Sequence, residues 1–171
     1  AEIVSVEERY PTQSGIPQLL QPTKYAGWDV VVRDGNGLSD LNTVRLSLGG
    51  DDDLGILFRM NEGCSATDAR LAITDACIGT IIGDELHIQF DFEVMWDLTL
   101  NGVNVGILEI RTYDTDGFMF HNENSAWTFD RSIDISITSI KDVTGITTME
   151  IITSDSILVA NDFIEIQGTV Y

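Results

Sequence analysis

The 171-residue sequence has few basic residues. Nine lysines and arginines stand against 28 aspartates and glutamates, which gives a formal charge of −19. A surface this negative repels phosphate backbones and anionic lipid headgroups, which argues against nucleic acids and acidic membranes as partners. It favours cations, basic surfaces and divalent metals. The same acidity also fits a protein that only needs to stay soluble outside the cell or in high salt.

The sequence also lacks long apolar runs. None reaches the roughly 20 residues that cross a bilayer, so we expect no membrane insertion. The chain has no starting methionine and no basic segment followed by an apolar one, as a signal peptide would have. We therefore expect a processed N-terminus or a fragment of a longer protein.

Motifs for catalysis are missing as well. There is no G-x-S-x-G, no H-E-x-x-H and no glycine-rich phosphate loop. Asp91 and Glu93 are two residues apart on one strand, as a glycosidase pair could be, but acidic side chains at solvent-facing positions explain them more simply. His121 has only Ser125 nearby as a nucleophile. We predict that the protein is not an enzyme.

Only two cysteines are present, Cys64 and Cys77. Zinc would need further ligands, and the two histidines, His87 and His121, are not clustered with them. A disulfide between the cysteines would stabilise the fold by about 3 kcal/mol and imply an extracellular or cell-surface location. Two buried free thiols are the alternative.

Period-two alternation is the main structural signal. In LHIQFDFEV, residues 86–94, the apolar and polar side chains alternate, and NTVRLSL at 42–48 behaves in the same way. No stretch predicts an amphipathic helix. The predicted strands are 2–7, 28–33, 43–48, 55–61, 69–74, 86–95, 105–113, 126–129, 132–140, 147–152 and a last one within 157–170. Many short, half-polar strands predict an all-β fold, an antiparallel sandwich of the Ig-like or jelly-roll kind.

Changes in composition divide the chain into three parts. Residues 1–24 hold all three prolines and read as an N-terminal strand with an irregular lead-in. Residues 25–140 would form the sandwich. Residues 141–171 would supply C-terminal strands, a linker, or the start of a next module or a donor strand.

Two acidic turns follow strand-like sequence. The first carries Asp34, Asn36 and, further on, Asp40, and the second carries Asp114 and Asp116. Calcium takes six to eight oxygen ligands, and such loops can supply several of them. Both turns, however, lack the first carboxylate and the final glutamate of an EF-hand loop. Hairpin turns also use D-G and N-G pairs, because glycine and asparagine tolerate positive φ. Calcium binding and plain turns are both open, with calcium the expected ion.

The stretch GWDVVVRDGNGLSDLNTVRLSL, followed by the cysteine-bracketed segment and LHIQFDFEVMWD, resembles the Ig-like modules of large prokaryotic surface proteins. The resemblance covers roughly residues 25 to 140 and implies a spacer, adhesive or lattice-forming role, with no catalytic residues. The cysteines are too close in sequence to be the inter-sheet bridge of antibody domains.

The last strand has no turn after it that returns the chain. Its apolar residues are Leu158, Ile164, Ile166 and Val170. An unpaired strand of this kind favours pairing with a neighbouring subunit or adjoining module. The sequence therefore predicts a structural subunit of a surface layer, adhesin or filament, with copies of itself or adjoining modules as partners.

The alternative is a calcium-supported carbohydrate-binding module of a secreted protein, with a glycan as its ligand. Such a module needs exposed aromatic side chains, so the exposure of Trp28, Trp96 and Trp127 discriminates between the two functions.

Overall fold

The computed structural model describes residues 1–11, 17–22, 24–50, 54–96, 98, 100, 103–115, 117–130, 137–142 and 149–153. All regular elements in this part of the chain are β-strands, and antiparallel sheets pack against one another. The predicted all-β class and the antiparallel sandwich are confirmed. The described residues contain no helix long and apolar enough to cross a membrane.

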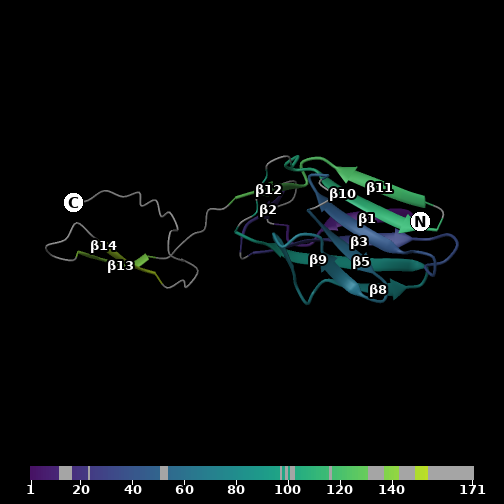
Figure 1. Cartoon of the computed structure of the whole chain (residues 1–171), viewed down its shortest axis with the longest axis horizontal. Helices are drawn as coiled ribbons and strands as arrows, with labels where there is room; N and C mark the ends of the chain where they lie inside the picture. Colours follow the sequence, from purple (N-terminus) through teal and green to yellow (C-terminus); the bar gives the residue numbers. More distant parts are fainter. Residues whose placement is uncertain are drawn as a thin grey trace. The chain divides into compact units, whose positions relative to one another are not determined.

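The first sheet has five strands. Its path runs from β1 (Glu2–Glu8) through β3 (Tyr25–Arg33) and β9 (Glu85–Val94) to β7 (Leu71–Ile73). The fifth strand, β8 (Ile78–Ile82), pairs with β9 beside β7. All these pairs are antiparallel. The first sheet therefore has β1 at one edge and β7 with β8 at the other. Figure 1 labels β1, β3, β9 and β8 of this sheet.

The second sheet also has five strands, all antiparallel. Its order is β11 (Gly117–Glu123), β10 (Leu108–Asp114), β4 (Thr43–Leu48), β5 (Gly55–Arg59) and β6 (Gly63–Ala66). Strands β11 and β6 are thus its two edges. A separate parallel pair joins β2 (Gln18–Leu20) to β12 (Trp127–Phe129).

The chain divides into two compact units, Ala1–Ser132 and Ile133–Tyr171. The first unit contains both five-stranded sheets. In the second, β13 (Ile137–Asp142) pairs with β14 (Met149–Thr153) in an antiparallel hairpin. The predicted assembly strand, with Leu158, Ile164, Ile166 and Val170, lies outside the described residues.

The core lies between the two sheets and follows from the alternation in the sequence. On β9, Leu86, Ile88, Phe90, Phe92 and Val94 are all buried. Strands β3, β4, β5 and β10 each contribute a similar row of apolar side chains. Full burial of such a side chain contributes about 1.5–3 kcal/mol, so these rows keep the two sheets together.

Cys64 and Cys77 are joined in a disulfide, with 6.0 Å between their Cα atoms. The predicted bond is confirmed. Cys64 lies on β6 of the second sheet, and Cys77 follows β7 and precedes β8 of the first. The bond therefore links the two sheets at one margin. The two cysteines are only 13 positions apart, yet the bond connects different sheets, because the chain crosses from one sheet to the other between β6 and β7.

Four strands lie where the sequence predicted none: β2, β6, β8 and β11. Strand β6 (GCSA) has small side chains, and β8 (IGTII) and β11 (GFMFHNE) do not alternate clearly between apolar and polar residues. All three are edge strands, which need only one partner and only partial burial. Their exposed positions remove the alternation on which strand prediction depends.

Candidate functional site

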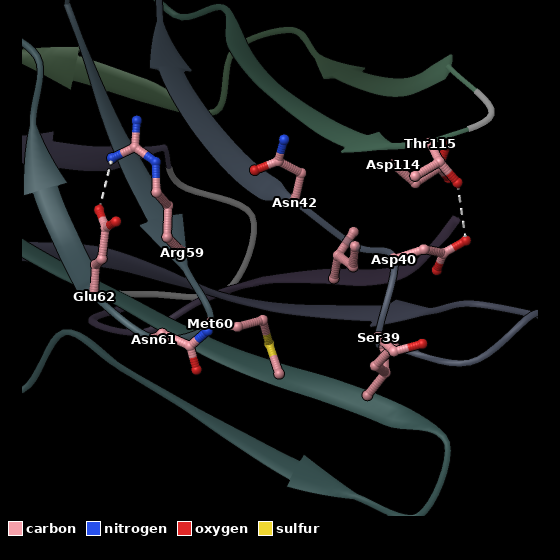
Figure 2. Close-up of a pocket in the computed structure, with 11 residues that line it drawn as sticks. Ser39, Asp40, Asn42, Arg59, Met60, Asn61, Glu62, Asp114 and Thr115 are labelled. Atoms are coloured by element: carbon pink, nitrogen blue, oxygen red, sulfur yellow. Dashed lines mark hydrogen bonds and ion pairs between the residues drawn. The ribbon is translucent and has the colours of Figure 1, made fainter.

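One end of the sandwich carries a hollow of about 610 Å³ between three turns. The turns follow β3, β5 and β10, so residues far apart in sequence meet there (Figure 2). The residues that line the hollow are Leu38, Ser39, Asp40, Leu41, Asn42, Arg59, Met60, Asn61, Glu62, Asp114 and Thr115. The set includes two of the predicted calcium ligands, Asp40 and Asp114.

Asp34 and Asp114, from the two acidic turns, meet at a single positive charge. The α-ammonium nitrogen of Ala1 lies 2.5 Å from Asp114 Oδ2 and 3.5 Å from Asp34 Oδ2. The two carboxylate side chains are only 6% and 3% exposed. The hydrogen bond to Asp114, opposed by burial and helped by Asp34, raises the pKa of this ammonium above its ordinary value of 8.0. The structure thus brings together two of the residues that the sequence selected.

Each of these carboxylates also supports its own turn through the other oxygen. Asp34 Oδ1 accepts a hydrogen bond from the backbone N–H of Asn36 at 3.0 Å, and Asp114 Oδ1 accepts one from the N–H of Gly117 at 2.9 Å. Gly37 and Gly117 have φ values of 95° and 143°, which only glycine adopts readily. Both aspartates therefore stabilise their turns through Oδ1, and Oδ2 of each faces the cation.

Two of the other predicted ligands, Asp40 and Asn36, are among the described residues. Asp40 Oδ2 accepts a hydrogen bond from Thr115 Oγ1 at 3.3 Å, shown in Figure 2, and its Oδ1 is buried with no hydrogen-bond partner among the described residues. Asn36 is exposed. Asp116 lies outside the described residues. Within those residues, no group of three or more His, Cys, Asp or Glu side chains could hold a metal ion, so calcium binding stays a prediction.

Asp91 has a different role from the one its sequence position suggests. It lies on the polar side of β9, where we expected a solvent-facing residue, yet it is only 1% exposed. Its carboxylate accepts hydrogen bonds from Arg9 Nε at 3.2 Å, from the Tyr10 hydroxyl and from Thr74 Oγ1. These three donors surround Asp91 on the outer face of the sheet. Asp91 is therefore a buried structural anchor, which accounts for it without catalysis.

The aromatic residues separate into core and surface groups. Trp28 and Trp127 are 2% and 1% exposed and belong to the core, whereas Trp96 is 41% exposed. Two of the three tryptophans are thus unable to form a sugar platform. The exposed aromatic surface is on β11 instead, where the ring of Phe118 lies 6.2 Å from Tyr113 and 6.5 Å from Phe120 between centroids.

Strand β11 is also the feature that sequence reasoning missed. Phe118, Met119 and Phe120 are 61%, 53% and 59% exposed. Successive side chains of a strand point to opposite faces, so three consecutive apolar residues leave both faces of this edge apolar. The run F-M-F after a D-x-D-G turn is a signal that could have revealed this edge.

Comparison of the chain with protein families, curated proteins and solved structures gave no match. The functional argument therefore depends on the edges of the sandwich and on the acidic turns.

Proposed function

We propose that this protein is an extracellular structural module of a surface layer, adhesin or filament, and that it assembles with copies of itself or adjoining modules by β-strand pairing. The observation that carries the proposal is β11, an edge strand whose three consecutive residues Phe118–Phe120 are each more than half exposed. Long apolar edges promote pairing with another chain, and proteins normally blunt them with charges, prolines or bulges.

Two further features support this proposal. The Cys64–Cys77 disulfide is compatible with an oxidising, extracellular environment. Asp91, one of the two carboxylates considered for catalysis, has structural partners in Arg9, Tyr10 and Thr74. A β-sandwich whose two sheets are linked by a disulfide suits a structural role that connects other modules.

Sedimentation velocity over a concentration series tests the proposal. The full chain should pass from a species of 18.9 kDa to larger assemblies as its concentration rises. A variant that lacks residues 157–171 should stay a folded monomer over the same range. A full chain that stays monomeric at every concentration, with or without calcium, would refute the proposal.

Calcium is the ion that we propose supports this fold or its assembly. Asp34 Oδ2 and Asp114 Oδ2 converge on one cation, which is the α-ammonium of Ala1 in this structure. A calcium ion would take the same two oxygens and would need further ligands, for which Asp40, Asn36 and Asp116 are the candidates. Calcium typically takes six to eight oxygens, so water would complete its coordination.

A carbohydrate-binding module is the second candidate function, and one observation favours it. Tyr113, Phe118 and Phe120 form a row of neighbouring rings on one face of β10 and β11. Beside them a hollow of about 230 Å³ is lined by Glu109, Arg111 and the two phenylalanines. The test is retention of the protein on immobilised polysaccharides. Retention by a monomeric wild type, and its loss in Phe118→Ser/Phe120→Ser, would favour this function over assembly.

A further inference from the structure

Strand β11 presents a free backbone edge as well as apolar side chains. Among the described residues it pairs with β10 and with no other strand. On the far side of β10, the Asn42 N–H donates to the Tyr113 carbonyl at 2.8 Å. Because residues in an antiparallel sheet alternate between their two neighbours, Tyr113 directs its backbone groups toward β4.

This alternation identifies which backbone groups on β11 are free for a partner. Phe118 lies opposite Tyr113, so its N–H and carbonyl point away from β10. The same holds two and four residues further along, at Phe120 and Asn122. The outer edge of β11 therefore offers a row of donors and acceptors next to side chains that are more than half exposed, which is the arrangement that strand addition uses.

The charges near β11 are mixed, and the segment that follows the described residues supplies an apolar occupant for this edge. Arg111 on β10 lies opposite Phe120 and forms an ion pair with Glu109 at 2.5 Å, and Arg45 lies one strand further in, on β4. Residues 154–171 contain Asp155, Asp162 and Glu165 and no lysine or arginine. The alternating apolar residues of this segment, Leu158, Ile164, Ile166 and Val170, match an edge strand whose exposed side chains are apolar.

We propose that β11 accepts residues 157–170 of a second copy of this chain as an added strand. In that added strand, Ile164 and Ile166 then cover the exposed phenylalanines of β11, with Asp162 on the same face and Glu165 on the opposite one. This inference depends on the proposed function and adds to it the acceptor edge and the segment that fills it.

The other edges are poorer acceptors. Strand β1 carries Glu2, Glu7 and Glu8, which repel an acidic segment. Strand β8 exposes Ile78, Ile81 and Ile82 at 48%, 53% and 58%, but it lies at the margin where the disulfide joins the two sheets. It also has the exposed Asp84 at its end, and β6 spans only four residues, Gly63–Ala66.

The test uses three full-length variants. Phe118→Ser/Phe120→Ser removes the acceptor side chains, and Ile164→Asp/Ile166→Asp disables the donor segment. Ile78→Ser/Ile82→Ser is the matched control, because it removes a similar exposed apolar pair from the other edge of the sandwich. Asn122→Pro is a second acceptor variant that removes one outward N–H from β11 and leaves the core unchanged.

The acceptor and donor variants should each sediment as monomers, and the control should assemble as the wild type does. An equimolar mixture of the acceptor and donor variants should form a dimer of twice 18.9 kDa and stop there, since each partner keeps one working half. Hydrogen exchange in that mixture should slow at the amides of Phe118, Phe120 and Asn122.

Three results would overturn the inference. One is assembly of the acceptor variants at the wild-type level. Another is a mixture that stays monomeric. The third is loss of assembly in the β8 control alone, which would place the acceptor at β8 and leave the proposed function intact. A wild-type chain that never assembles refutes the proposed function itself, so the two failures are distinguishable.

Discussion

Replacing Asp91 with asparagine removes a buried charge from the outer face of the first sheet and leaves the side-chain volume nearly unchanged. In the wild type, the carboxylate accepts hydrogen bonds from Arg9, Tyr10 and Thr74, and it is 1% exposed. These donors hold the end of β1 and the segment before Cys77 against β9. Burial, followed by the hydrogen bond to Asp91, raises the pKa of the Tyr10 hydroxyl above 10.0, so this group stays a donor at neutral pH.

The expected loss is large because the partners remain in place. An asparagine keeps one acceptor oxygen and turns an N–H₂ group toward the remaining donors. The guanidinium of Arg9 is 17% exposed and keeps its ion pair with Asp29 at 2.7 Å, but it loses the hydrogen bond from Nε to the Asp91 carboxylate. Leaving a buried hydrogen-bonding group without its partner typically costs about 1–3 kcal/mol. We expect a loss of this size in the free energy of unfolding of the first unit.

Urea unfolding followed by tryptophan fluorescence measures this loss. All three tryptophans lie within Ala1–Ser132, so the signal reports on the sandwich unit alone. With a urea dependence of about 2 kcal/mol per molar, the midpoint should fall by roughly 1 M. Glu93→Gln, two residues further along β9, is the control and should stay within about 0.5 kcal/mol of the wild type. A loss below about 1 kcal/mol for Asp91→Asn would refute the anchor role.

The remaining predictions concern the acidic turns and the disulfide. Millimolar calcium should raise the melting temperature more than sodium chloride of equal ionic strength, and Asp34→Asn/Asp114→Asn should remove the difference. Equal effects of the two salts would mean that these aspartates only stabilise their turns. The raised pKa of the Ala1 ammonium adds stability that is complete below its unfolded value of 8.0 and is lost as the pH rises through the folded value. Stability should therefore fall above about pH 8 in the wild type and much less after Asp114→Asn, as urea titrations at several pH values would show. Intact mass should rise by about two hydrogens on reduction, and Cys64→Ser/Cys77→Ser should cost about 3 kcal/mol, whereas free thiols in the native protein would contradict the structure.

The central strands of the sandwich could be predicted from the sequence because each pairs with a strand on both sides and buries one of its two faces in the core. In β9, alternation from Leu86 to Val94 marks the core side without reference to the fold. The edge strands could not be predicted in this way. Strand β8 exposes three isoleucines, and β11 places apolar residues on both of its faces, so neither alternates clearly between apolar and polar residues.

The two acidic turns could be predicted from the sequence, but the contact of Asp34 and Asp114 with the Ala1 ammonium could not. Asp34 and Asp114 are 80 positions apart in the numbering, and only the register of the two sheets brings them to the Ala1 ammonium. Asp91 shows the opposite error, because alternation places it on the polar side and gives no sign that Arg9 and Tyr10 cover it. Tertiary contacts of this kind depend on topology, which local periodicity does not encode.

Sedimentation of the equimolar mixture of Phe118→Ser/Phe120→Ser and Ile164→Asp/Ile166→Asp tests strand-mediated assembly most directly. Each variant alone should be a monomer of 18.9 kDa, and the mixture should give a dimer that grows no further. A mixture that stays monomeric, beside a wild type that assembles, would contradict pairing between β11 and the terminal segment. A wild type that is itself monomeric at every concentration would contradict assembly altogether.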